Sequence, residues 1–142
     1  MTVIAWDGEV LAADKRVSFG TSIATTTKIH QINGMLVGCS GGAAQGASCI
    51  QWVRDGMVRS QYPDSQKDDA CSMLIIMPDG AIHYYSKTPD PLIVEGRTFA
   101  IGSGSEYAEA AMYLGKTARE AVAVAIALDS GCGNGVDELV LA

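Results

Sequence analysis

Three short turn signals, each lying between two apolar runs, constrain the fold of this chain most strongly. They are Asp7-Gly8, Asn33-Gly34 and Pro78-Asp79-Gly80. Asn-Gly and Asp-Gly favour β-hairpins, because both central residues of the tight turn need positive φ angles. The flanking runs, such as CSMLIIM, are apolar on consecutive residues rather than on alternate ones. This pattern is typical of strands covered on both faces, and it predicts sheets that are buried on both sides.

The first hairpin sets where the N-terminus lies relative to the second strand. A two-residue turn at Asp7-Gly8 predicts that Ala5 pairs with Val10 and Thr2 with Ala13. In this register Met1 lies opposite Asp14. Because side chains alternate along a strand, a shift of one residue turns a hydroxyl to the other face of the sheet.

Three segments are expected to be helices, at residues 42–60, 105–115 and 117–131. Thr117 and Glu120 form a capping-box pattern at the start of the third, and Gly131 is expected to cap its end. A strand over residues 136–142 follows. No linker, repeat or low-complexity stretch interrupts the chain, so we expect one α+β domain over residues 1–142, with helices packed on sheets.

Composition and motif spacing exclude several classes of function. The chain has only ten Lys and Arg and a net charge of −6, which argues against nucleic-acid binding. No apolar run is long enough to span a membrane and no signal segment begins the chain, so a cytoplasmic location and no membrane partner are expected. The four cysteines and two histidines lack closely spaced ligand pairs, so we expect reduced, mostly buried thiols and no metal. The segments GSGSEY and GKT lack glycines that nucleotide-binding loops require, so no cofactor is expected.

Thr2 directly follows the initiator methionine, and removal of Met1 would give a free N-terminal threonine. A threonine hydroxyl needs a base, and an α-amino group with a pKa of about 7.7–8.0 supplies one on the same residue. A nearby lysine keeps the amine neutral, a carboxylate holds the lysine, and backbone N–H groups bind the oxyanion. The chain offers candidates for these parts in Asp14, Lys28, Gly38 and the turn at residues 102–105.

Four blocks of the sequence resemble the proteasome β-subunit and HslV-type peptidase family of threonine N-terminal-nucleophile (Ntn) hydrolases. They occur in the order of the family and span nearly the whole chain. The blocks are DGEVLAADKRVSFG, TKIHQINGMLVGCSGG, FAIGSGSEYAEAAMYLG and TAREAVAVAIALDSGCGNGVDEL.

The resemblance implies a role for six residues. Thr2 would be the nucleophile, Lys28 the lysine beside it and Asp14 the carboxylate that holds the lysine. The further implied residues are Gly38 as the oxyanion donor, Ser103 beside the threonine amine, and Asp129 as the later aspartate. Cys132 falls where many members of the family have a serine.

The resemblance also implies a fold, an activity and partners. The implied fold is the four-layer αββα sandwich of two mainly antiparallel sheets. One outer helical layer is reduced, because only PDSQKDDA lies between Tyr62 and Cys71, where the family has a second long helix. The implied activity is a threonine-type endopeptidase that cleaves peptides or unfolded proteins through an acyl-enzyme. It would work inside a homo-oligomeric ring, with an ATP-dependent unfoldase as a partner.

Two alternatives stay open at this level. One is a catalytically inactive relative that serves as a structural or assembly subunit. The other is a nucleophilic cysteine at Cys39, for which the sequence shows no base. Cys39 also suits an ordinary strand residue that faces the core.

Overall fold

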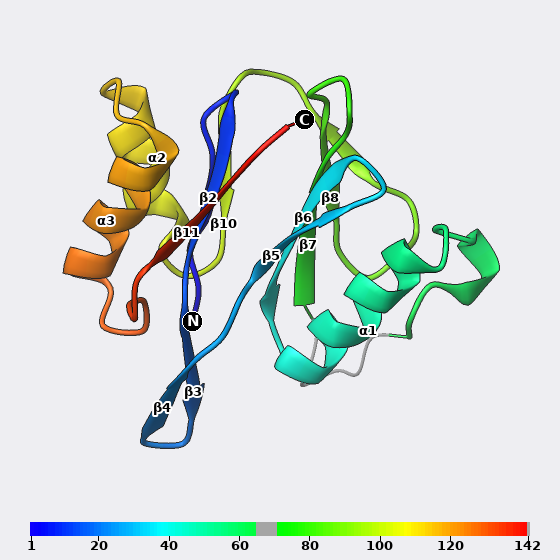
Figure 1. The fold of residues 1–142 in the computed structure, drawn as a ribbon, viewed down its shortest axis with the longest axis horizontal. Helices are drawn as coiled ribbons and strands as arrows, with labels where there is room; N and C mark the ends of the chain where they lie inside the picture. The colour runs from blue at the N-terminus through cyan, green and yellow to red at the C-terminus, as the bar shows by residue number, and fades with distance from the viewer. Residues whose placement is uncertain (65–70, 142) are drawn as a thin grey trace.

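Two antiparallel sheets stack face to face in the computed structural model, and helices cover both outer faces (Figure 1). The structure describes residues 1–64 and 71–141. Its strands are β1 (Ile4–Trp6), β2 (Val10–Asp14), β3 (Arg16–Phe19), β4 (Ser22–Thr25), β5 (Ile29–Ile32), β6 (Met35–Gly41), β7 (Cys71–Ile76), β8 (Ile82–Tyr85), β9 (Leu92–Val94), β10 (Phe99–Ile101) and β11 (Val136–Val140). Its helices are α1 (Ala43–Arg54), the short 3-10 helix η1 (Arg59–Gln61), α2 (Ser105–Tyr113) and α3 (Ala118–Leu128).

Hairpin connections account for most of the strand order. The first sheet has the order β10-β1-β2-β11, and the second has the order β5-β6-β7-β8-β9. All pairs in both sheets are antiparallel. The three predicted hairpins are therefore present, as β1-β2, β5-β6 and β7-β8. Strands β3 and β4 form a separate two-stranded ribbon, which the sequence analysis did not predict.

Consecutive apolar residues in the strands point into different layers of the core. In β7, Leu74 and Ile76 join the cluster between the two sheets, whereas Met73 and Ile75 join the cluster beneath α1. In β1, Ile4 and Trp6 face the other sheet, and Ala5 packs beneath α2 and α3. The prediction of strands covered on both faces is confirmed, and the four layers are α2–α3, sheet, sheet and α1 (Figure 1).

The predicted start of the last helix is confirmed, but its predicted end is wrong. Thr117 Oγ1 accepts a hydrogen bond from the Glu120 N–H, and Glu120 accepts one from the Thr117 N–H, which completes the capping box. The helix ends at Leu128, with Asp129 as its C-terminal cap residue. Gly131 therefore does not cap it. Its N–H donates instead to the Asp129 carboxylate.

The predicted register of the first hairpin is also wrong. Ile4 pairs with Ala13 and Trp6 with Leu11, a displacement of two residues from the predicted pairing. The reason lies in Asp7, whose side chain accepts hydrogen bonds from the N–H groups of Glu9 and Val10. The turn is thus moved to Gly8 and Glu9. Val3, rather than Met1, comes to lie against Asp14.

The helical layer over the second sheet consists of α1 and η1 in the described residues. The other outer layer has the two helices α2 and α3 (Figure 1). The reduced helical layer is thus confirmed, whereas residues 65–70 of the PDSQKDDA segment lie outside the described part of the chain. Among the described residues, no helix is long and apolar enough to cross a bilayer.

Candidate active site

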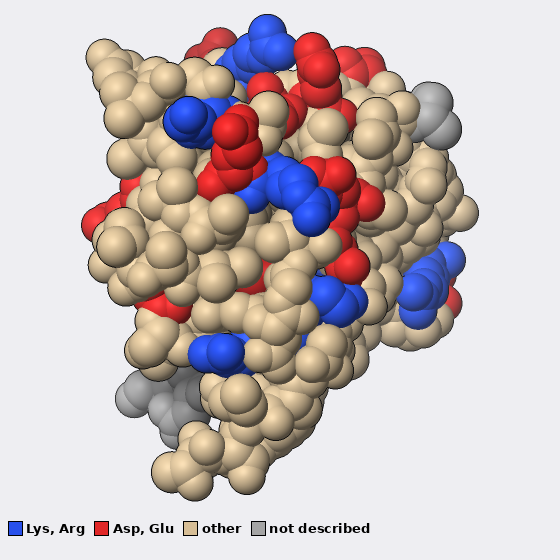
Figure 2. All heavy atoms as spheres, turned by 60° about the vertical axis from the view of Figure 1, so that its left-hand side comes forward, with Lys and Arg blue, Asp and Glu red and all other residues tan. Residues whose placement is uncertain are grey.

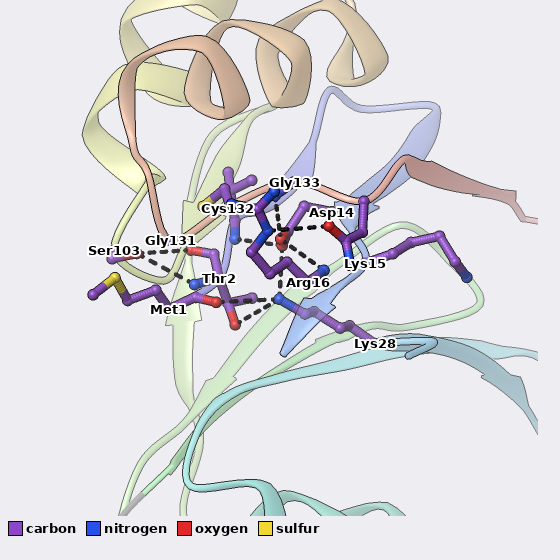
Figure 3. A network of polar contacts seen from close by, with 12 residues as sticks. Met1, Thr2, Asp14, Lys15, Arg16, Lys28, Ser103, Gly131, Cys132 and Gly133 are labelled. Atoms are coloured by element: carbon purple, nitrogen blue, oxygen red, sulfur yellow. Dashed lines mark hydrogen bonds and ion pairs between the residues drawn. The ribbon is translucent and has the colours of Figure 1, made fainter. Parts of the chain in front are cut away.

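Segments far apart in the sequence bring five of the six predicted site residues together near the N-terminus (Figure 3). Thr2 precedes β1, Asp14 ends β2, and Lys28 directly precedes β5. Ser103 lies in the turn between β10 and α2, and Asp129 follows α3. The first sheet carries Thr2 and Asp14, and the second sheet supplies Lys28, so the site lies where the two sheets meet.

Lys28 is the centre of this network. Its Nζ lies 2.9 Å from Asp14 Oδ1, 3.1 Å from Thr2 Oγ1 and 3.2 Å from the Met1 carbonyl oxygen (Figure 3). A lysine ammonium has three N–H donors, so all three are used. Only 7% of the Lys28 side chain is exposed. The hydroxyl of Thr2 therefore faces a desolvated positive charge.

Asp14 is fully buried and holds both the lysine and the backbone around it. Besides Lys28, its Oδ1 accepts a hydrogen bond from the Val3 N–H at 3.1 Å. Its Oδ2 accepts hydrogen bonds from the N–H groups of Arg16 at 3.2 Å and Gly133 at 3.0 Å. Four donors, three backbone N–H groups and one ammonium, thus surround this carboxylate. Asp14 thus fixes Lys28 and the strand that carries Thr2 at the same time.

Ser103 lies against the nitrogen of Thr2. Its hydroxyl donates to Asp129 Oδ2 at 2.6 Å and accepts a hydrogen bond from the Thr2 N–H at 3.2 Å. The hydrogen bond from Ser103, followed by that from the Gly131 N–H, lowers the pKa of Asp129. The nitrogen of Thr2 is therefore linked to an anionic carboxylate through one hydroxyl.

The turn around Ser103 is shaped by two glycines. Gly102 has a φ of +97°, and a Cβ at this position would overlap the carbonyl oxygen of Thr2. The Gly104 N–H donates to that same carbonyl at 3.1 Å. Glycine adopts positive φ without steric penalty and lets two backbones approach closely. The GSGS segment thus holds the peptide of Thr2 against the turn.

Gly38 is the predicted site residue that the described contacts do not bring into the network. It lies within β6, paired with Ile29 on one side and Leu74 on the other. A Cβ there would lie 2.9 Å from Ile4 Cδ1 and 3.0 Å from Ile29 Cγ2. Close packing between the sheets is therefore one physical reason for glycine at this position.

The four cysteines are thiols that form no disulfide, and three of the four are buried. Burial and the charges of Asp14 and Asp129 raise the pKa of Cys132 to about 12, so this thiol stays protonated near neutral pH. Its Sγ lies 3.5 Å from Asp129 Oδ2. Cys39 is half-buried and packs against the cluster beneath α1. Among the described residues, no group of three or more His, Cys, Asp or Glu side chains is arranged to hold a metal ion.

A cavity of roughly 640 Å³ opens beside Thr2 and Lys28. Its wall is formed by the β3 ribbon, by the end of β6 and by one side of α1. Most residues of this wall, including Arg16, His30 and Arg54, are not among the site residues predicted from the sequence. These residues are far apart in the sequence, and no spacing pattern links them. Only the packing of α1 and the ribbon against the second sheet brings them together.

We expect a Ser103→Ala substitution to change how the stability of the protein depends on pH. The pKa of Asp129 is lowered mainly by the Ser103 hydroxyl. A lowered carboxyl pKa stabilises the fold above the ordinary value of about 3.9, and this contribution is lost as the pH falls through the folded-state pKa. The difference in the free energy of unfolding between parent and variant should therefore be largest at pH 5–7 and should shrink below about pH 4.

Urea denaturation of the parent and the variant between pH 7 and pH 3 measures this difference. As a control, Asp129→Asn removes the titrating carboxyl, so adding Ser103→Ala to that variant should cause a loss that does not vary with pH. A difference between parent and Ser103→Ala that stays constant over the whole range would contradict the assigned hydrogen bond.

Comparison with known proteins supports this description of the fold. The family model of the proteasome subunit matches residues 1–67. The solved structure of eukaryotic HslV from Trypanosoma brucei superposes with a TM-score of 0.75 at 18% identity, covering 99% of this chain and 98% of that one. BPH, a bacterial proteasome homologue from Thiobacillus denitrificans, in complex with epoxomicin, has a TM-score of 0.71 at 20% identity, covering 100% of both chains. No curated protein sequence matches the chain.

The two stacked sheets with outer helices thus have the αββα architecture of the Ntn hydrolases, as the sequence predicted. Within that class, the match to the proteasome subunit model covers the segment that carries Thr2, Asp14 and Lys28. Residues 1–67 are thus similar to the proteasome subunit family, and the whole chain shares its fold with HslV and with the bacterial proteasome homologue.

Proposed function

We propose that the protein is a threonine-type endopeptidase whose nucleophile is the hydroxyl of Thr2 after Met1 has been removed. One observation carries this proposal: Lys28 Nζ bridges Asp14 Oδ1 and Thr2 Oγ1 at 2.9 and 3.1 Å. A buried ammonium ion beside a hydroxyl stabilises the negative charge that develops on oxygen during nucleophilic attack.

The first half of the proposed reaction forms an ester. The neutral α-amine of Thr2 accepts the proton of Oγ1, and Oγ1 attacks the carbonyl carbon of the scissile peptide bond. The resulting tetrahedral oxyanion collapses, the C–N bond breaks, and the protonated amine of Thr2 gives its proton to the leaving nitrogen. The new amino terminus departs and the acyl group remains on Thr2 Oγ1.

The second half restores the enzyme. The same α-amine accepts a proton from a water molecule, which attacks the ester carbon. The bond to Oγ1 breaks, Oγ1 recovers a proton, and a peptide with a free carboxyl group leaves. Each half uses the amine once as base and once as acid.

Ser103 and Asp129 have a positioning role in this proposal. Ser103 Oγ already accepts a hydrogen bond from the Thr2 nitrogen and donates to Asp129. After removal of Met1 the same contact would hold the α-amine so that its lone pair can face Oγ1. Gly38 is proposed to donate its backbone N–H to the oxyanion on the family resemblance alone, because its described neighbours are Ile4 and Ile29 rather than Thr2.

Removal of Met1 is a requirement of this chemistry. In the intact chain the Thr2 nitrogen is an amide, which has no basic lone pair. The Met1 carbonyl also occupies one of the three N–H donors of Lys28. Cleavage of the Met1–Thr2 bond would therefore create the base and free a donor at the site.

We also propose a homo-oligomeric ring in which one domain, spanning residues 1–142, forms each subunit. Large apolar side chains are exposed at the ends of the two helices of one outer layer, with Tyr113 90%, Leu114 77% and Leu128 61% exposed. Contacts between copies would cover such groups.

On the face seen in Figure 2, acidic and basic side chains are intermingled and form no continuous basic surface. Peptides or unfolded proteins as substrates, an unfoldase partner and a cytoplasmic location complete this proposal.

Reaction with epoxomicin, the compound bound to BPH from Thiobacillus denitrificans, tests the proposed nucleophile. We expect the intact mass of the protein without Met1 to increase by one inhibitor. The Thr2→Ala variant should give no adduct and should hydrolyse no peptide, because it keeps the amine but lacks the oxygen nucleophile. Circular dichroism should show the same fold in both proteins.

Two outcomes would contradict the proposal. Hydrolysis by Thr2→Ala at the parental rate would assign the activity to another residue. A parent protein that lacks Met1 yet forms no adduct and cleaves no peptide would favour the alternative, an inactive subunit that contributes the sandwich to an assembly.

A further inference from the structure

The cavity beside Thr2 has a basic wall. Four of its lining residues carry basic side chains, and none of the described lining residues is Asp or Glu. These four are Arg16, Lys28, His30 and Arg54. They come from three separate segments of a chain whose net charge is −6. The excess of basic groups is therefore local to this cavity.

Among the residues that the structure describes, a carboxylate pairs with only one of these basic groups. Lys28 pairs with Asp14. Arg16 donates to Asn134 Oδ1 at 3.1 Å and to the Ser130 carbonyl at 2.8 Å, and both acceptors are uncharged. The Arg54 side chain makes no hydrogen bond or ion pair within the described part of the chain. An anion that entered the cavity would thus meet guanidinium charge that no carboxylate among residues 1–64 and 71–141 balances.

The face of α1 toward the cavity leaves room for a side chain to reach Arg54. Lining residues recur along this face with helical spacing, at Ala43, Gly46, Ala47, Ile50 and Arg54. The first three are small and lie nearest the end of β6. Ile50 and Arg54 follow one and two turns further along. Space is therefore open near Thr2, and the charge lies at the far end of the same helix face.

His30 lies close enough to Arg54 to respond to its charge. Burial and, to a smaller degree, the positive charge of Arg54 lower the pKa of His30. The imidazole is therefore largely neutral near pH 7 and offers one N–H donor. A guanidinium and an imidazole N–H on one wall are a suitable pair of donors for a carboxylate.

We propose that this cavity selects substrates with an acidic side chain on the residue that precedes the scissile bond, and that Arg54 is the main determinant. The inference rests on the proposed function, because that residue is the one whose carbonyl carbon becomes bonded to Thr2 Oγ1. Its side chain leaves the backbone one bond from that carbon, beside the mouth of the cavity. A Glu or Asp side chain entering there finds Arg54 and His30 ahead of it.

The test uses three fluorogenic peptide amides that differ only in the residue before the scissile bond, which is Glu, Gln or Lys. Glu and Gln have the same shape, so their ratio of kcat/KM reports charge alone. For the protein without Met1 we expect Glu to exceed Gln by about tenfold, which equals about 1.4 kcal/mol and lies between an exposed and a desolvated ion pair. Lys should be the poorest of the three.

Two variants of Arg54 assign the preference to its charge. In Arg54→Ala the Glu-to-Gln ratio should fall close to one, with hydrolysis of the Gln peptide retained. In Arg54→Glu the Lys peptide should become the best of the three. Arg119→Ala is the matched control, since Arg119 lies on α3 and pairs with Glu138 at 3.6 Å, and it should leave every ratio unchanged. Thermal unfolding of each variant checks the fold, because Arg54 lies in the last turn of α1.

The outcomes separate this inference from the proposed function. If the parent cleaves the peptides without favouring Glu, or if Arg54→Ala keeps the preference, the specificity proposal is wrong and the peptidase proposal stands. If no peptide is cleaved and epoxomicin forms no adduct, both are wrong. Loss of the Glu preference in Arg54→Ala together with its reversal in Arg54→Glu would support both.

Discussion

Replacement of Lys28 by Met is expected to abolish reaction with epoxomicin and to lower the free energy of unfolding by about 3–5 kcal/mol. Both effects have one origin. Lys28 is the cation beside the Thr2 hydroxyl and also the partner of a fully buried carboxylate. Without it, Asp14 keeps three backbone N–H donors but loses the charge that balances it. Urea denaturation and the rate of adduct formation measure the two effects separately.

A double variant separates stability from activity. Adding Asp14→Asn to Lys28→Met removes the unbalanced charge, so part of the lost stability should return. The recovery is partial, because the introduced amide nitrogen would face the backbone N–H groups of Arg16 or Gly133. Adduct formation should stay absent. A Lys28→Met protein that reacts with epoxomicin at the parental rate would show that Lys28 has no part in the chemistry.

Lys15→Met is the matched control for these variants. Lys15 is a neighbouring lysine that pairs with Asp137 at 2.7 Å, with both side chains partly exposed. A surface ion pair of this kind contributes only about 0–1 kcal/mol. We therefore expect little change in stability and none in adduct formation for Lys15→Met.

Gly102→Ala is expected to be the second most damaging substitution. The φ of Gly102 is +97°, and a Cβ there would overlap the Thr2 carbonyl oxygen. Gly115 has nearly the same φ of +93° but has no atom within 4 Å of such a Cβ. In Gly115→Ala the free energy of unfolding should thus fall by only about 1–3 kcal/mol, which is the strain that positive φ imposes on alanine. In Gly102→Ala the free energy of unfolding should fall by about 1–3 kcal/mol more, since the overlap with the Thr2 carbonyl has to be relieved.

The difference between these two variants isolates the contact between the GSGS turn and Thr2. To relieve the overlap in Gly102→Ala, the backbone of Thr2 or of the turn has to move. Either movement separates Thr2 from Ser103 or Lys28. We therefore expect slower adduct formation in Gly102→Ala, whereas Gly115→Ala should react like the parent. Equal stability and equal reaction rates in the two variants would contradict the described contact. Urea denaturation and intact-mass kinetics provide both measurements.

Local patterns and the family resemblance were sufficient to predict three hairpins, the start of α3 and most of the residues in the network around Lys28. Turn residues between apolar runs predicted three hairpins, and a capping box predicted the start of α3, because both signals act over a few neighbouring residues. The resemblance to the family supplied the order of Thr2, Asp14, Lys28, Ser103 and Asp129, which the fold brings together. The roles of these residues in catalysis remain predictions.

Hydrogen bonds of individual side chains decided the register of the first hairpin and the end of the last helix. A side chain, Asp7, moved the first turn by hydrogen bonds to Glu9 and Val10, and with it the register that places Val3 against Asp14. Gly131 does not cap α3, because Asp129 ends that helix and binds the Gly131 N–H. Such outcomes depend on which donors and acceptors meet, and periodicity carries no information on that.

The sequence by itself determined that the chain forms strands covered on both faces and that it carries an ordered set of residues suited to threonine chemistry. Only the tertiary structure decided that the Thr2 hydroxyl faces Lys28, and that Arg16, His30 and Arg54 share one cavity. The physical reason is that these contacts join residues from different sheets, a ribbon and a helix. Their geometry is set by the packing of the layers, which no stretch of neighbouring residues specifies.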